Sequence, residues 1–122
     1  MQKILLVFLG GGAGSLARYG VAEALSESSK NFPYATLCAN IAACIVLGFV
    51  GTLAVKDSVT DATRLLLVTG FCGGFSTFST FSNETFLLLQ QGKLAAALFY
   101  ATSSLIFCLI GVWLGNLISS RV

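Results

Sequence analysis

The sequence predicts an all-α membrane protein with four transmembrane helices, and two observations support this fold class. Of its 122 residues, 56% are hydrophobic and only 10% are charged, whereas a soluble domain carries about 25% charged residues. Four apolar segments separated by short polar loops are each long enough to cross a bilayer, which takes about 20 helical residues. We therefore expect one four-helix transmembrane domain over residues 1–122.

The four helices are predicted at about residues 4–25, 34–55, 64–89 and 94–120. Arg18 interrupts the first apolar run, and Pro33 stands just ahead of the second, where proline is tolerated. The third segment has charges only at Arg64 and Glu84, and the second and fourth have none. The loops between the helices are short and polar, so we expect neighbouring helices in the chain to run in opposite directions.

The composition argues against an enzyme and against a nucleic-acid-binding protein. The chain has no histidine, which removes the commonest general base and metal ligand. A net charge of +2 is too small to indicate a nucleic-acid partner. All four cysteines lie in apolar runs, and none forms a CxxC pair. We expect them to act as small hydrophobic residues.

The distribution of positive charge gives only a weak preference for one orientation. With four spans, one side of the membrane carries Lys3, Lys56, Arg64 and Arg121, and the other carries Lys30 and Lys93. The tally is four against two, or four against three if Arg18 snorkels to the second side. Orientation follows the positive charge only where the bias is clear. We therefore expect insertion in both orientations and assembly of two opposed copies as an antiparallel homodimer.

Geometry also favours an oligomer. Four helices pack around their own side chains and leave little room for an aqueous path, so a conduit is expected between subunits or in clefts at their edge. Steps of small residues from Gly10 to Gly14 and from Gly111 to Gly115 predict close helix packing.

The segment TGFCGGFSTFSTFSNE, residues 69–84, combines phenylalanines, glycines and hydroxyl side chains. Phe78 and Phe81 lie three residues apart and share a helix face. Their ring edges are electropositive and favour an anion, while the hydroxyls of Thr77, Ser79 and Thr80 can replace lost hydration. We interpret this pattern as the wall of a narrow pore, and the alternative is an aromatic packing stripe.

The paired glycines Gly73 and Gly74 predict a break in the third helix. Where the helix unwinds, the carbonyls of Gly73 and Ser76 lose their intrahelical partners and can point at a cation, as unwound backbone does in other membrane proteins. A simple kink packed against a neighbouring helix is the alternative.

Other polar residues in the spans are candidates for the same path. Asn40, in the second span, offers two amide donors. Tyr100 and Ser104 share one face of the fourth helix, where interhelical hydrogen bonding is an equal alternative. Arg18 either anchors an interface or attracts anions. Glu84 either caps the pore mouth or pairs with a cation.

These motifs resemble the Fluc/CrcB fluoride channels. The resemblance rests on GGGAGSLARY at residues 10–19, the central Asn40 and GFCGGFSTFSTFSNE at residues 70–84, and it covers the whole chain in length, span count and motif order. It implies a dual-topology dimer with two fluoride pores and a structural sodium ion at its centre. Phe78, Phe81 and Asn40 would then belong to the pore. The carbonyls of Gly73 and Ser76 would bind sodium, two from each subunit.

The resemblance also implies a polar track through Tyr100 and Ser104 on the fourth helix, and it matches Glu84 to the terminal acid of the motif. The expected function is passive fluoride export across a bacterial inner membrane. The alternative is a small four-helix, proton-coupled multidrug exporter. That mechanism needs a carboxylate deep in the first helix, and this chain has only Glu23 near the helix end.

Overall fold

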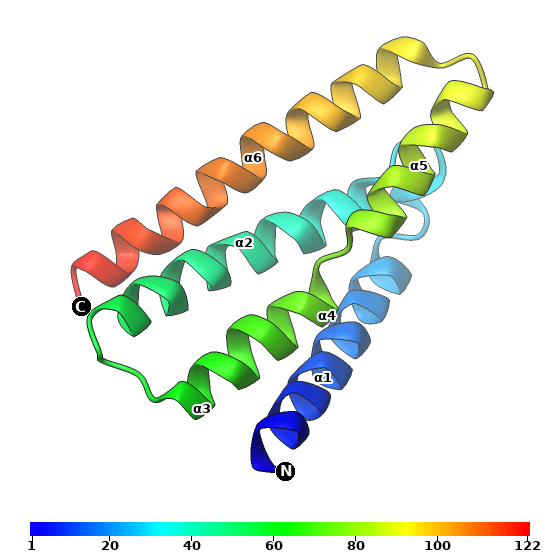
Figure 1. Ribbon diagram of the computed structural model, residues 1–122. Helices are drawn as coiled ribbons and strands as arrows, with labels where there is room; N and C mark the ends of the chain where they lie inside the picture. The colour runs from blue at the N-terminus through cyan, green and yellow to red at the C-terminus, as the bar shows by residue number, and fades with distance from the viewer.

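The computed structural model describes all residues, 1–122, and every regular element in it is helical. In chain order the elements are α1 (Gln2–Ala24), η1 (Ser28–Lys30), α2 (Tyr34–Val55), α3 (Asp61–Arg64), η2 (Leu65–Cys72), α4 (Gly73–Phe75), α5 (Phe78–Gln90) and α6 (Leu94–Ser120). The third span is assembled from α3, η2, α4 and α5 (Figure 1). Four stretches are long and apolar enough to cross a membrane: Gln2–Ala24, Tyr34–Val55, Asp61–Gln90 and Leu94–Ser120. The predicted all-helical class with four spans is confirmed.

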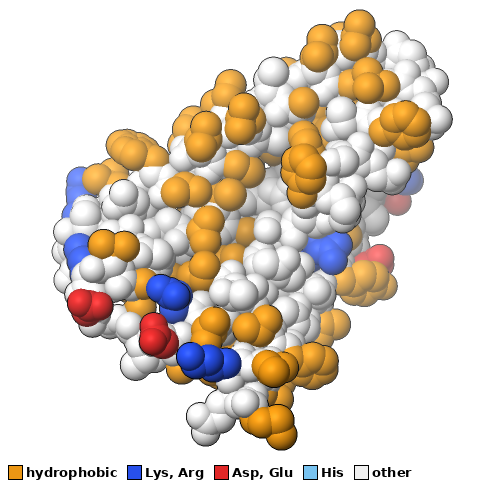
Figure 2. All heavy atoms as spheres, viewed as in Figure 1, with side chains coloured by type: hydrophobic (Ala, Val, Ile, Leu, Met, Phe, Trp, Pro, Cys, Tyr) orange, Lys and Arg blue, Asp and Glu red, His pale blue; other side chains and the backbone are white.

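The surface of the chain is largely apolar, unlike the surface of a water-soluble protein. Only 18 of the 122 residues are buried, and large apolar side chains such as Phe8 and Trp113 are mostly exposed. Figure 2 shows hydrophobic side chains spread over the visible face, with charged side chains at the end that holds the C-terminus and again at the right of the view. In water such exposed apolar surface is unfavourable, so lipid and further protein are its expected surroundings.

Helices α2 and α6 pack against each other at close range along much of their length (Figure 1). A Cβ atom at Gly48 would collide with the Val112 carbonyl, and one at Gly115 would collide with the Ile45 carbonyl. Close backbone approach through small residues is how membrane helices gain packing contacts without a hydrophobic driving force. The predicted packing role of the step from Gly111 to Gly115 is confirmed.

Helix α1 packs on the third span in the same way. A Cβ at Gly10 would meet the Leu66 carbonyl, and a Cβ at Gly14 would meet the Phe71 carbonyl. The third span contributes its own glycine, because a Cβ at Gly74 would collide with the backbone of Gly11. The step from Gly10 to Gly14 therefore lies at a tight helix interface, as its sequence predicts.

The third span differs from the prediction in two respects. Gly73 and Gly74 are helical, and the extended residues are instead Ser76 (φ −80°, ψ 156°) and Thr77 (φ −152°, ψ 116°). The prediction that the backbone leaves the helix at the glycine pair is wrong because Gly74 is needed for helix packing, whereas a side chain from α2 stabilises the extended backbone at Thr77. In addition, Leu65–Cys72 forms a π-helix, a wider turn that is frequent near functional sites.

Candidate functional site

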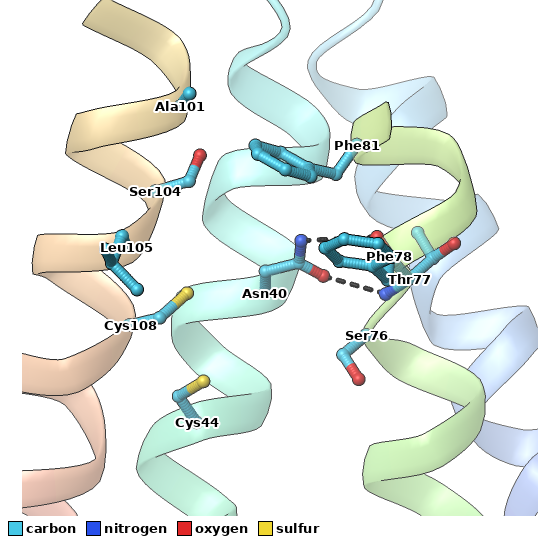
Figure 3. Close-up of a pocket in the computed structure, with 10 residues that line it drawn as sticks. All are labelled: Asn40, Cys44, Ser76, Thr77, Phe78, Phe81, Ala101, Ser104, Leu105 and Cys108. Carbon is cyan, nitrogen blue, oxygen red and sulfur yellow. Dashed lines mark hydrogen bonds between the residues drawn. The ribbon is translucent and has the colours of Figure 1, made fainter. Parts of the chain in front are cut away.

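Asn40 on α2 supplies the hydrogen bonds that the extended backbone needs. Its Oδ1 accepts from the Thr77 N–H at 2.8 Å, and its Nδ2 donates to the Thr77 carbonyl at 3.5 Å (Figure 3). In a regular helix the Thr77 N–H would donate to the Gly73 carbonyl. The Asn40 side chain thus takes the place of the Gly73 carbonyl as the acceptor of the Thr77 N–H, directly before α5 begins at Phe78.

The first turn of α5 is capped by the Thr77 side chain. Its Oγ1 accepts from the Thr80 N–H at 3.2 Å, a typical N-cap bond. The same hydroxyl is bonded to the hydroxyls of Thr80 and Ser79, each at 3.1 Å. The three hydroxyls predicted to lie along the pore therefore form one cluster at the start of α5.

These two caps leave two backbone carbonyls without their usual helical donors. The Gly73 carbonyl loses the Thr77 N–H to Asn40, and the Ser76 carbonyl loses the Thr80 N–H to Thr77. Both are the carbonyls that the sequence singled out as possible cation ligands, although the extended residues lie downstream of the expected break. Backbone oxygens freed in this way are a known sodium-coordinating device in membrane proteins.

A pocket of about 280 Å³ opens beside the extended residues. Its walls come from α2, the Ser76–Thr77 segment, α5 and α6 (Figure 3). The lining residues are Asn40, Cys44, Ser76, Thr77, Phe78, Phe81, Ala101, Ser104, Leu105 and Cys108. The structure thus brings together Asn40, Thr77, Phe78, Phe81 and Ser104, which the sequence placed on three separate helices.

Phe78 and Phe81 form the aromatic pair of this pocket, with ring centroids 5.7 Å apart and planes inclined by 39°. Their surroundings differ. Phe81 is half-buried and packs on the Tyr100 ring at 5.2 Å, whereas the Phe78 side chain is 80% exposed. Packing within the chain therefore explains Phe81 and does not explain Phe78.

Ser104 presents an unused hydroxyl to the same pocket. The residue is only 7% exposed, and its Oγ has no hydrogen-bond partner. A buried polar atom without a partner costs about 1–3 kcal/mol, and such groups are rare in native proteins. The Ser104 hydroxyl is therefore free to donate to a polar or anionic group in the pocket.

Tyr100 does not line the pocket but is connected to it through Phe81. It is fully buried, and its hydroxyl donates to Glu84 Oε2 at 2.7 Å. Thr36 donates to the other carboxylate oxygen of Glu84 at 2.8 Å. Glu84 is therefore held by two hydroxyl donors and makes no ion pair. It also lines a second hollow of about 160 Å³, together with Lys30 and Lys93.

The sequence analysis did not identify Thr36 as a site residue. The signal was present, because Thr36, Asn40 and Cys44 follow at four-residue steps and so share one face of α2. Asn40 and Cys44 line the first pocket, and Thr36 bonds Glu84.

Arg18 lies beside the third span. Its Nε donates to the Gly74 carbonyl at 3.2 Å. This bond satisfies a carbonyl near the end of α4 and ties α1 to the segment that precedes the extended residues. Two roles were predicted for Arg18, anchoring an interface and attracting anions, and this hydrogen bond is a contact of the anchoring kind.

Comparison with known proteins gives one consistent result. A family model described as "CrcB-like protein, Camphor Resistance (CrcB)" matches residues 5–116. The chain is 41% identical over 116 residues to the fluoride-specific ion channel FluC of Phocaeicola vulgatus, covering 94% of this chain and 96% of the relative. It is 38% identical over 124 residues to the protein of the same name from Flavobacterium psychrophilum, covering both chains fully.

A third relative with that name, from Chlorobium chlorochromatii, is 44% identical over 119 residues, covering 97% of this chain and 92% of the relative. These relatives are bacterial and are named as ion channels, which agrees with the expectation that the chain is not an enzyme. With four apolar helices, the protein is a multi-pass protein of the bacterial inner membrane. The matched length and the identity over the whole chain show that it belongs to the CrcB-like family, in which the relatives named above are fluoride-specific ion channels.

Proposed function

We propose that this protein is a fluoride-selective channel that passively exports fluoride from the cytoplasm. The observation that carries the proposal is the pocket of about 280 Å³, where Phe78, Phe81, Asn40 and the orphaned Ser104 hydroxyl converge. The names of the relatives support the choice of fluoride. The protein thereby lowers the toxicity of fluoride, which enters acidified cells as neutral HF and is trapped inside as the anion.

The chemistry of the pocket suits a small, strongly hydrated anion. The edges of the Phe78 and Phe81 rings carry partial positive charge, which attracts an anion without binding it as tightly as a lysine would. Asn40 keeps donor capacity, since its amide has two N–H groups and the one bond that they make is long. Ser104 adds a hydroxyl donor. Together these groups replace part of the hydration that the ion loses.

The working unit is an antiparallel homodimer of two chains in opposite orientations. The support is that a single chain leaves the pore wall incomplete, because the Phe78 ring is 80% exposed and lines the pocket from one side only. A second copy would cover this ring and close the path. The weak charge bias across the four spans permits both orientations.

A structural sodium ion at the dimer centre, held by the Gly73 and Ser76 carbonyls of both copies, completes the proposal. The residues fit this role because both carbonyls have lost their helical donors and oxygen ligands suit a hard cation. Gly73 also faces open space, with no atom near the position of a Cβ. The ion would link the two copies through backbone oxygens.

Fluoride efflux from proteoliposomes tests the function. Liposomes that contain the purified protein are loaded with fluoride or chloride, and an ionophore for the counter-cation starts the efflux. We expect rapid loss of fluoride and retention of chloride. Equal loss of the two anions, or no loss of either from vesicles that contain folded protein, would contradict the proposal.

Reporter fusions at the C-terminus test the dual orientation. We expect activity of both a cytoplasmic reporter and a periplasmic reporter, because the positive charges are nearly balanced. Added lysines in one set of loops should bias the orientation and abolish function unless an oppositely biased copy is co-expressed. A uniform wild-type orientation would contradict the antiparallel dimer.

A further inference from the structure

Two cysteines lie in the wall of the same pocket and are not used by the proposed function. Cys44 is one helical turn beyond Asn40 on α2, and Cys108 is one turn beyond Ser104 on α6. Both side chains line this pocket, one from each side of the α2–α6 interface, and Figure 3 shows them in the part of the pocket away from Phe81. Neither is bound in a disulfide.

The helix packing holds this pair together. The Cys44 Cβ lies 3.3 Å from the place where a Cβ at Gly111 would be, and Gly48 and Gly115 bring the two helix backbones into contact nearby. The separation of α2 and α6 is therefore fixed at the level of the thiols.

We propose that Cys44 and Cys108 form a two-thiolate binding site for a soft, two-coordinate metal ion, of which Hg²⁺ is the probe, and that a bound ion obstructs the pocket. Thiolates select soft metals, and a thiol ligand must lose its proton when it binds. The balanced step is Hg²⁺ + 2 RSH → (RS)₂Hg + 2 H⁺. The product is neutral, which suits a membrane interior where a net charge is costly.

The third nearby cysteine does not complete a larger site. Cys72 is buried and lines a neighbouring hollow with Cys44, but no group of three or more metal-ligating side chains is present. Cys38 is exposed elsewhere on α2. Two thiolates are therefore the available ligands in this pocket, and Cys38 and Cys72 provide two matched controls in the same chain.

The test is retention of mercury by the purified full-length protein. One equivalent of HgCl₂ is added, a monothiol such as glutathione competes for it, and metal per chain is measured by elemental mass spectrometry. Binding through a second, tethered thiolate raises the apparent affinity by about 10²–10⁴. We expect wild type, Cys38→Ser and Cys72→Ser to retain one ion. Cys44→Ser and Cys108→Ser should require at least about 100-fold less competitor to lose it.

Cys44→Ala and Cys108→Ala repeat the measurement without adding a hydroxyl, and circular dichroism confirms that each variant is folded. Retention by the Cys44 and Cys108 variants equal to that of wild type, or equal loss in Cys72→Ser, would overturn the site. The obstruction rests on the proposed function, so fluoride efflux is measured in parallel. A protein that retains mercury but never conducts fluoride supports the site and contradicts the proposed function. A protein that conducts fluoride but releases mercury overturns the site alone.

Discussion

The two faces of the third span carry adjacent glycines with opposite surroundings. Gly74 lies on the face toward α1, where a Cβ would collide with the Gly11 backbone. Gly73, its neighbour, faces open space, and so does Phe78 a little further along. We call the side of the third span that packs on α1 the closed face, and the side with Gly73 and Phe78 the open face. Packing within the chain explains why residue 74 is glycine, but it explains neither Gly73 nor the exposed Phe78 ring. The open face is therefore where a second copy, a sodium ion and a fluoride path have room.

The largest effect is expected from alanine at the closed face. Gly74→Ala places a methyl group into the Gly11 carbonyl, which is backbone and cannot rotate away. Overpacking typically costs about 1–3 kcal/mol and occasionally more. Because the obstacle here is backbone only 2.3 Å away, we expect a cost above that typical range and loss of monodisperse, folded protein in size-exclusion chromatography. Gly73→Ala is the matched control and should keep the helical circular dichroism spectrum. Similar yields of folded, monodisperse protein for Gly74→Ala and Gly73→Ala would contradict the claim that only the Gly74 side is tightly packed.

A larger residue at the open face should act on assembly instead. Gly73→Val adds a β-branched side chain beside the carbonyls proposed to bind sodium, so we expect folded chains that no longer form dimers. Ser76→Ala changes no backbone oxygen and should keep both the dimer and fluoride efflux. Sodium should stabilise the wild-type dimer, measured by its dissociation in detergent. A wild-type dimer indifferent to exchange of sodium for a large organic cation, after long dialysis, would exclude the sodium site.

Asn40 lines the pocket and binds the Thr77 backbone, so its variants should affect efflux. Aspartate keeps the acceptor for the Thr77 N–H but loses the amide donors and adds a negative charge. Two like charges about 4 Å apart repel by about 4 kcal/mol at an effective dielectric constant of 20, which exceeds the roughly 1 kcal/mol of one hydrogen bond. We expect fluoride efflux through Asn40→Asp to be slower than through Asn40→Ser. Equal efflux would indicate a purely structural role.

The smallest effect on stability concerns the hydrogen bonds among Tyr100, Glu84 and Thr36 behind the pocket. Tyr100→Phe keeps the ring against Phe81 but removes the donor to Glu84. Loss of a hydrogen bond to a charged group costs about 1.5–3 kcal/mol, so the thermal midpoint should fall. Tyr19→Phe, at an exposed position on α1, should leave that midpoint within the error of measurement. A similar change in both variants would show that the bond to Glu84 contributes nothing to stability.

The spans were predictable from sequence because lipid requires about 20 apolar helical residues for each crossing, and their bounds agree closely with α1, α2 and α6. The aromatic pair was predictable as a candidate site because a plain membrane helix does not need the mixture of phenylalanine, glycine and hydroxyl side chains in residues 69–84. Asn40 was predictable because a membrane-spanning amide needs hydrogen-bond partners. The position of the extended residues was not predictable. It depends on two contacts between distant residues, Asn40 with Thr77 and Gly74 with Gly11, and local glycine content says nothing about either.

Fluoride efflux through Phe78→Ala tests the central claim, that the open face of the third span forms the pore wall. Because this ring is 80% exposed in the single chain, its truncation should barely alter folding, so a loss of efflux cannot be attributed to lost core packing. Phe86→Ala, another exposed phenylalanine on α5 that does not line the pocket, is the control. We predict that Phe78→Ala lowers fluoride efflux from proteoliposomes at least tenfold, about 1.4 kcal/mol in barrier height, while Phe86→Ala conducts as wild type does. Efflux at the wild-type rate through folded Phe78→Ala would contradict the claim.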